Sequence, residues 1–203
     1  MLATYPALRT VGQGFIVTLT VTNTGGATAN SLAAAAFVHA PAGIATQAAG
    51  PTPPVTGTLA GGAAKTFTWT FTGVAAGTTT LSTTVTGTDA NSAGALLASA
   101  SAVSPLIQTP GALAGQLTVF PATVSTGSQF MVMLTVTNTG QATVNGITGS
   151  APVKTGTGNA ALSAGPYPAY PASLAGGSWI VFTWTYTASV AGTVTYSAAT
   201  GGV

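Results

Sequence analysis

The sequence has very few charged residues. Only 2% of its 203 residues are Asp, Glu, Lys or Arg, whereas soluble domains carry about 25%. Nucleic-acid binding needs several clustered cations to neutralise phosphates, so three scattered cations exclude a nucleic-acid partner. Low charge also leaves little repulsion between copies, which favours association. The ionisable side chains are Arg9, His39, Lys65, Asp89 and Lys154.

Cysteine and long apolar runs are both missing. Without cysteine the chain has neither disulfides nor thiol chemistry. The mean hydropathy is +0.53, but the most apolar run, residues 32–44, is interrupted by His39, Pro41 and Gly43. A membrane-spanning helix needs about 20 continuous apolar residues, so we do not expect one. The residues after Met1 lack signal-peptide features, so an exported form would be the mature portion of a longer precursor.

Groups for catalysis and metal binding are equally scarce. A paired-carboxylate mechanism needs two acids, and Asp89 is the only one. A hydrolytic triad would need Asp89, His39 and a serine, but no Gly-x-Ser-x-Gly motif exposes a nucleophile. One imidazole makes no metal site, and residues 89–91 are predicted as an Asx turn, not a calcium loop. We therefore expect no catalytic residue, metal or cofactor, and no enzyme activity.

The sequence consists largely of one unit written twice. Residues 15–25 recur at 130–140, and residues 67–71 recur at 182–186, both with an offset of 115. Gly-Pro, Leu-Ala-Gly-Gly and Ala-Gly-Thr segments keep the same offset, so the alignment needs no gap. Asn23 and Asn138 end the first repeated segment and are predicted to form tight turns that tolerate positive φ.

Within each copy, apolar residues alternate with threonine. Residues 15–21 and 66–72 place Phe, Val, Leu and Trp on one face and Thr on the other, as in half-buried strands. Trp69 and Trp184 are expected in the two cores. Short strands between Gly, Pro and Asn turns predict an all-β fold of two tandem immunoglobulin-like β-sandwich domains. We expect these at residues 1–103 and 117–203, with a Pro/Gly linker at 104–116.

These motifs resemble the conserved-repeat and cell-adhesion-related (CARDB-like) domains of prokaryotic surface proteins. The resemblance lies in the strand ending Thr-Val-Thr-Asn-Thr-Gly, the Leu-Ala-Gly-Gly turn, the Phe-Thr-Trp-Thr-Phe strand and the Ala-Gly-Thr turn. It covers almost the whole chain in both copies. It implies immunoglobulin-like sandwiches, export, and tandem use as stalks, adhesins or fibres. The scarcity of Asp and Glu departs from the family pattern and argues against calcium sites.

The second copy has gained three aromatic residues outside the shared pattern. Tyr167, Tyr170 and Trp179 replace Thr52, Val55 and Ala64. Three interpretations stay open: a loop that packs on its own sandwich, a subunit interface, or a platform on which a surface glycan stacks.

The two copies also end differently. Residues 95–103 are predicted as the closing strand of the first domain, but Val203 corresponds to Thr88, so the second domain is expected to lack that strand. A neighbouring subunit would then add a strand, unless the polypeptide continues or the domain closes with fewer strands. The candidate donor is the N-terminal segment, with Leu2, Thr4, Tyr5, Leu8 and Val11.

Together these features predict a structural subunit of an extracellular filament or cell-surface layer that assembles with copies of itself. The alternative is an adhesin or carbohydrate-binding module that uses Tyr167, Tyr170 and Trp179. A further alternative is an accessory domain of a secreted enzyme. For each of these functions we expect the protein to be extracellular or at the cell surface.

Overall fold

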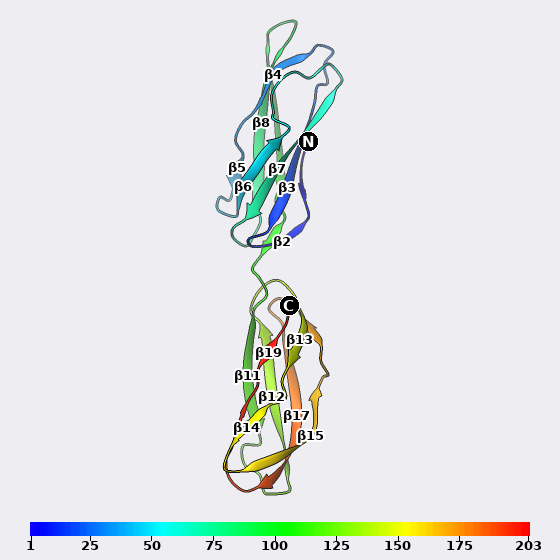
Figure 1. Cartoon of the computed structure of the whole chain (residues 1–203). Helices are drawn as coiled ribbons and strands as arrows, with labels where there is room; N and C mark the ends of the chain where they lie inside the picture. The colour runs from blue at the N-terminus through cyan, green and yellow to red at the C-terminus, as the bar shows by residue number, and fades with distance from the viewer. The chain divides into compact units, whose positions relative to one another are not determined.

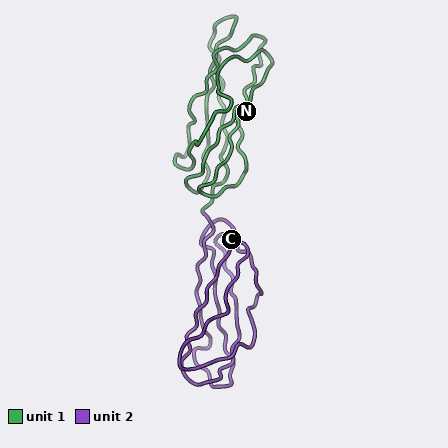
Figure 2. Tube along the Cα trace, in the orientation of Figure 1, with its two compact units in different colours: residues 1–109 green, residues 110–203 purple.

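The computed structural model describes residues 1–203 and contains nineteen β-strands and no helix (Figure 1). The all-β sandwich fold expected from the alternating pattern is confirmed. The chain divides into two compact units, residues 1–109 and 110–203, called unit 1 and unit 2 (Figure 2). It has no helix of the length and apolarity that crossing a membrane requires.

Unit 1 is a sandwich of two antiparallel sheets. In the first, the order is β1 (Leu2–Tyr5), β3 (Gly14–Thr22), β7 (Ala64–Gly73) and β6 (Ala45–Thr52). In the second, β8 (Thr80–Asp89) pairs with three strands: β4 (Ala29–Ala34), β5 (Val38–Ala40) and β9 (Ala95–Val103). A short parallel pair joins β2 (Leu8–Thr10) to β10 (Leu106–Gln108).

The core of unit 1 lies between these two sheets. Because side chains alternate along a strand, the odd-numbered apolar residues of β3 and β7 face inward and the threonines face outward. The register places Phe15 opposite Phe71, Val17 opposite Trp69, and Leu19 opposite Phe67. Trp69 and its counterpart Trp184 are both buried, as the alternating pattern predicts.

Unit 2 repeats the first sheet and shortens the second. Its first sheet has the order β11 (Leu113–Phe120), β12 (Gln129–Asn138), β17 (Trp179–Val190) and β15 (Asn159–Tyr167). The facing strands form two short sheets: β16 (Ala172–Leu174), β13 (Val144–Gly149) and β19 (Thr200–Gly201), and β14 (Val153–Gly156) with β18 (Val194–Ser197). Within these residues, no strand of unit 2 takes the place that β9 holds beside β8 in unit 1.

The linker is shorter than the sequence analysis predicts. Residues 104–116 are expected to join the domains, but β10 pairs with β2 and the first half of β11 pairs with β12. The physical reason is burial of apolar side chains. Ile107 is fully buried and lies where a Cβ on Gly73 would stand 2.9 Å from it, so this segment closes the end of the unit 1 core. Unit 1 therefore extends to Thr109.

Candidate functional site

The three aromatic residues that distinguish copy two separate into two groups. Tyr167 is 80% exposed and Trp179 is 66% exposed. Tyr167 lies opposite Thr183, and Trp179 lies four residues before Thr183 on β17, so both side chains are on the outer face of this sheet. Tyr170 instead packs on Phe182, with 4.5 Å between the ring centroids. The three residues therefore do not form one exposed cluster.

Tyr170 belongs to a set of tyrosines that face the core of unit 2. The hydroxyl oxygens of Tyr170 and Tyr196 are buried without a hydrogen-bond partner. Burial raises the pKa of both phenols, and for Tyr196 the nearby Tyr186 raises it further. Burial also raises the pKa of Tyr186, whose hydroxyl lies 3.4 Å from the carbonyl of Pro152. These hydroxyls therefore stay protonated at physiological pH.

The N-terminal segment predicted as a strand donor is built into unit 1 itself. Leu2 is buried, and the Thr4 hydroxyl donates to the carbonyl of Val103 at 2.7 Å. Donation to a neighbour would first require these contacts to break, so the segment is not a free donor. Its partners within unit 1 are Leu19 for Leu2, Val17 for Thr4, Ile16 for Tyr5, Leu106 for Leu8 and Gln108 for Val11.

The ionisable side chains lie apart from one another. No group of three or more His, Cys, Asp or Glu side chains gathers anywhere in the structure. The Asp89 carboxylate accepts from the backbone N–H groups of Ser92 (2.8 Å) and Asn91 (2.9 Å), which confirms the Asx turn. These hydrogen bonds, together with one from the Ser92 hydroxyl, lower the pKa of Asp89. The Lys154 ammonium donates to the Asn159 side chain at 3.1 Å and to the carbonyl of Ala160.

Both units carry an exposed apolar pair on the outer face of the first sheet. Tyr5 lies opposite Ile16 in unit 1, and Phe120 lies opposite Met131 in unit 2. All four side chains are exposed, and each pair occupies the same position of the repeat. The other outward positions of β3 and β7 in unit 1 are threonine, apart from Gly14 and Ala64, so this part of the face carries no charge.

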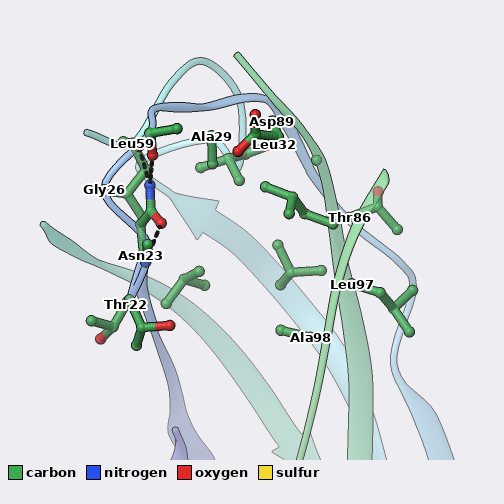
Figure 3. A pocket seen from close by; sticks show the side chains of 17 residues that line it. Thr22, Asn23, Gly26, Ala29, Leu32, Leu59, Thr86, Asp89, Leu97 and Ala98 are labelled. Carbon is green, nitrogen blue, oxygen red and sulfur yellow. Dashed lines mark hydrogen bonds between the residues drawn. The ribbon is translucent and has the colours of Figure 1, made fainter. Parts of the chain in front are cut away.

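Unit 2 has a cavity of about 680 Å³, lined in part by Phe130 and Tyr196. Unit 1 has a groove between the ends of β3 and β9 (Figure 3). It consists of two adjoining cavities of about 550 Å³ and 210 Å³. The two cavities share the lining residues Val21, Thr22, Val85 and Ala98. Asp89 is the only ionisable side chain of the lining.

At the end of the groove, Asn23 acts differently from its predicted role. Neither Asn23 nor Asn138 has positive φ, so the turn does not use them for that purpose. The Asn23 amide nitrogen instead donates to the carbonyls of Ala27 (2.8 Å) and Leu59 (2.9 Å), joining two loops to the end of β3. Asn138 does the same in unit 2 with the corresponding carbonyls of Ala142 and Leu174.

In unit 2 the corresponding place is filled by the chain itself. Residues 113–116 pair with the last residues of β12, and Gly111 lies so close to Val144 that a Cβ on this glycine would stand 2.5 Å from the valine side chain. The Thr139 N–H donates to the carbonyl of Ala112 at 2.7 Å, and the Ala112 N–H donates to the Asn138 side chain at 3.2 Å. In unit 1 the groove lies at the corresponding place.

No family model matches the chain, and no curated protein matches its sequence. The resemblance to CARDB-like domains therefore stays a prediction. Among solved structures, the chain is similar to the secreted serine protease VesC from Vibrio cholerae, with a TM-score of 0.32, 12% identity, and coverage of 93% of this chain and 48% of that one. It is also similar to red sea bream transglutaminase, with a TM-score of 0.30, 14% identity, and coverage of 100% and 29%.

A third similar structure is the CsuC–CsuE chaperone–tip adhesion subunit pre-assembly complex from archaic chaperone-usher Csu pili of Acinetobacter baumannii. Its TM-score is 0.29 at 10% identity, with coverage of 97% of both chains. The chain spans about half of the protease and less than a third of the transglutaminase. At these TM-scores the similarities assign no function.

Proposed function

We propose that the chain is a non-enzymatic structural subunit of an extracellular filament or cell-surface layer, with copies of itself as its partner. The observation that carries this proposal is the pair of exposed apolar residues repeated on both units. Tyr5 with Ile16, and Phe120 with Met131, stand on outer sheet faces at the same position of the repeat. Exposed apolar patches on a sandwich face favour protein–protein contact.

The scarcity of charge supports the same proposal. Charged side chains at the centre of an interface must be desolvated, and these faces carry almost none. Two similar faces on one chain provide two attachment points, which is what an assembly of many copies needs. Strand addition between subunits would join copies through their sheet edges in addition to their faces.

The experiment is to replace Tyr5 and Phe120 together by Glu. Both side chains are exposed, so the fold is retained. Sedimentation velocity and negative-stain microscopy of the unaltered chain at rising concentration should show polymers, and the double variant should stay monomeric. A matched control places Glu at the exposed positions Ser101 and Thr195 on the opposite sheets. Polymers that form equally well from the double variant, or none from the unaltered chain, would overturn the proposal.

A second candidate is glycan binding through the outer face of unit 2. It is favoured by the exposure of Tyr167 and Trp179 on one face, because exposed aromatic rings stack on sugars. Tyr170 takes no part, since it packs on Phe182. Binding on a glycan array that is lost in Trp179→Ala and kept in Tyr170→Phe would support this candidate over self-assembly.

A further inference from the structure

The outer face of the first sheet differs between the two units although its strand pairing is the same. The buried residues of β3 recur unchanged in β12, so the core does not account for the difference. Four outward positions of unit 2 carry an aromatic or apolar side chain where unit 1 has threonine or alanine. They are Met133 for Thr18, Tyr167 for Thr52, Trp179 for Ala64 and Val181 for Thr66.

The strand register brings these side chains together on one surface. Met133 lies opposite Thr183, and Thr183 lies opposite Tyr167, so one row crosses three strands. Val181 and Trp179 precede Thr183 on β17 at two-residue steps and therefore share its face. The apolar pair described above adjoins Met133 along β12. The apolar face of unit 2 thus consists of Phe120, Met131, Met133, Tyr167, Trp179 and Val181.

This face is open to solvent and carries no charge. The rings of Phe120, Tyr167 and Trp179 are each more than half exposed. The only charged side chain of unit 2 is Lys154, which lies on β14, outside the first sheet. Large contiguous apolar patches on a protein surface mark sites that another molecule covers.

The size and composition of the apolar face favour a second copy of itself as the occupant. Four strands about 4.8 Å apart and about ten residues long form a face of about 600 Å². Two such faces bury about 1,200 Å² in total, which reaches the range of specific interfaces. A face without charge meets its own copy without like-charge repulsion. Met133 and Val181 at its centre suit the interdigitated packing of two sheets better than contact with sugar hydroxyls.

We propose that the apolar face of unit 2 packs on the same face of a second copy and forms a closed, two-fold dimer. This inference rests on the proposed self-assembly and assigns its strongest contact to unit 2. A two-fold contact uses each face once, so growth beyond the dimer needs a different surface. Tyr5 and Ile16 on unit 1 provide that second surface.

The experiment uses the full chain carrying Tyr5→Glu, which disables the contact through unit 1 and leaves the apolar face of unit 2 unchanged. Sedimentation velocity should show a monomer–dimer equilibrium and no larger species. Trp179 is the only exposed tryptophan, since Trp69 and Trp184 are buried, so acrylamide quenching of tryptophan fluorescence should fall as the dimer forms. Trp179→Ala should raise the dissociation constant at least about tenfold.

The repeat itself supplies a variant that tests the face without threatening the fold. Unit 1 folds with threonine or alanine at the four positions, so unit 2 should fold with them as well. The combination Met133→Thr, Tyr167→Thr, Trp179→Ala and Val181→Thr should abolish the dimer. The control is Thr195→Glu, which adds a charge at an exposed position of β18 and should leave the dimer unchanged.

Three results would each overturn the inference: a Tyr5→Glu chain that stays monomeric up to about 1 mM, one that grows beyond the dimer, or a dimer that survives the fourfold replacement. A glycan or a foreign protein as the occupant would give the first of these. Polymers of the unaltered chain beside a monomeric Tyr5→Glu chain would refute this inference alone. A Tyr5→Glu dimer without polymers of the unaltered chain would refute the proposed function alone.

Discussion

Unit 1 and unit 2 have separate cores of the same pattern, and they cover the edges of their sheets differently. Unit 1 has β9 along the whole of β8 but only a four-residue β1. Unit 2 has an eight-residue β11 along β12 but no strand in the place of β9. The repeated residues therefore determine the sandwich, whereas the flanking segments determine which edges are covered.

The greatest loss of stability should come from replacing core residues that recur in both units. Trp69→Ala and Trp184→Ala each remove a buried indole, and each should lower the free energy of unfolding of its own unit by about 3–5 kcal/mol. Chemical denaturation followed by circular dichroism measures this loss. Trp179→Ala, on the same strand as Trp184 but exposed, should cost less than about 0.5 kcal/mol. A large cost for Trp179 would contradict the assignment of inward and outward faces.

A backbone feature common to both units should give the next largest effect. Gly50 (φ 106°) and Gly165 (φ 117°) each lie where an added Cβ would come within 2.7 Å of a carbonyl oxygen of the adjacent strand. Replacement by Ala combines a disfavoured φ with this clash and should cost about 3 kcal/mol in either unit. Gly57→Ala, with positive φ but open space around it, is the control and should cost about 1 kcal/mol. Equal costs at all three positions would contradict the close approach.

The paired asparagines distinguish the covered edge from the open one. Asn138 is fully buried, and its carbonyl oxygen accepts from Gly140 and from Ala112 of the covering segment. Asn23 is partly buried, and its oxygen accepts from Gly25. Asn138→Ala should therefore cost about 1 kcal/mol more than Asn23→Ala, the value of one further hydrogen bond. Equal losses in denaturation midpoints would show that the covering segment contributes nothing.

The smallest difference should appear at alkaline pH. An unfolded tyrosine titrates near pH 10, whereas burial raises the folded pKa of Tyr170, Tyr186 and Tyr196 in unit 2. The folded state then binds more protons above about pH 10, so this stability is full below that pH and is lost as the pH rises through the folded values. Unit 1 contains only Tyr5, which is exposed. Denaturation at about pH 8 and pH 11 should weaken unit 2 selectively, and Tyr170→Phe should reduce the loss.

Much of the fold can be predicted from the sequence because it depends on the alternation of apolar residues with threonine. Phe15, Val17 and Leu19 alternate with threonine, and this pattern specifies which side of a strand is buried whatever the rest of the chain does. The linker is harder to predict. Pro105 and Pro110 suggest an open segment, but Ile107 between them is drawn into the core by an apolar contact with a distant strand.

The candidate site is harder to predict from the sequence than the fold. Tyr167, Tyr170 and Trp179 suggest one cluster because they are close in sequence. Tyr170, however, points inward and packs on the Phe182 ring. The groove has no sequence motif of its own. Only the pairing of residues 113–116 with β12 in unit 2 shows which strand edge the groove of unit 1 borders.

Native-state amide hydrogen exchange at matched threonines can decide whether the two units differ at this edge. Residues 1–5 pair with β3 as far as Thr20, whereas residues 112–120 pair with β12 and the residues after it as far as Thr139. The amides of Thr137 and Thr139 should therefore exchange on the order of 100-fold more slowly than those of Thr22 and Thr24 in the unaltered chain. Equal protection at the two pairs of positions would contradict this difference in strand pairing between the units.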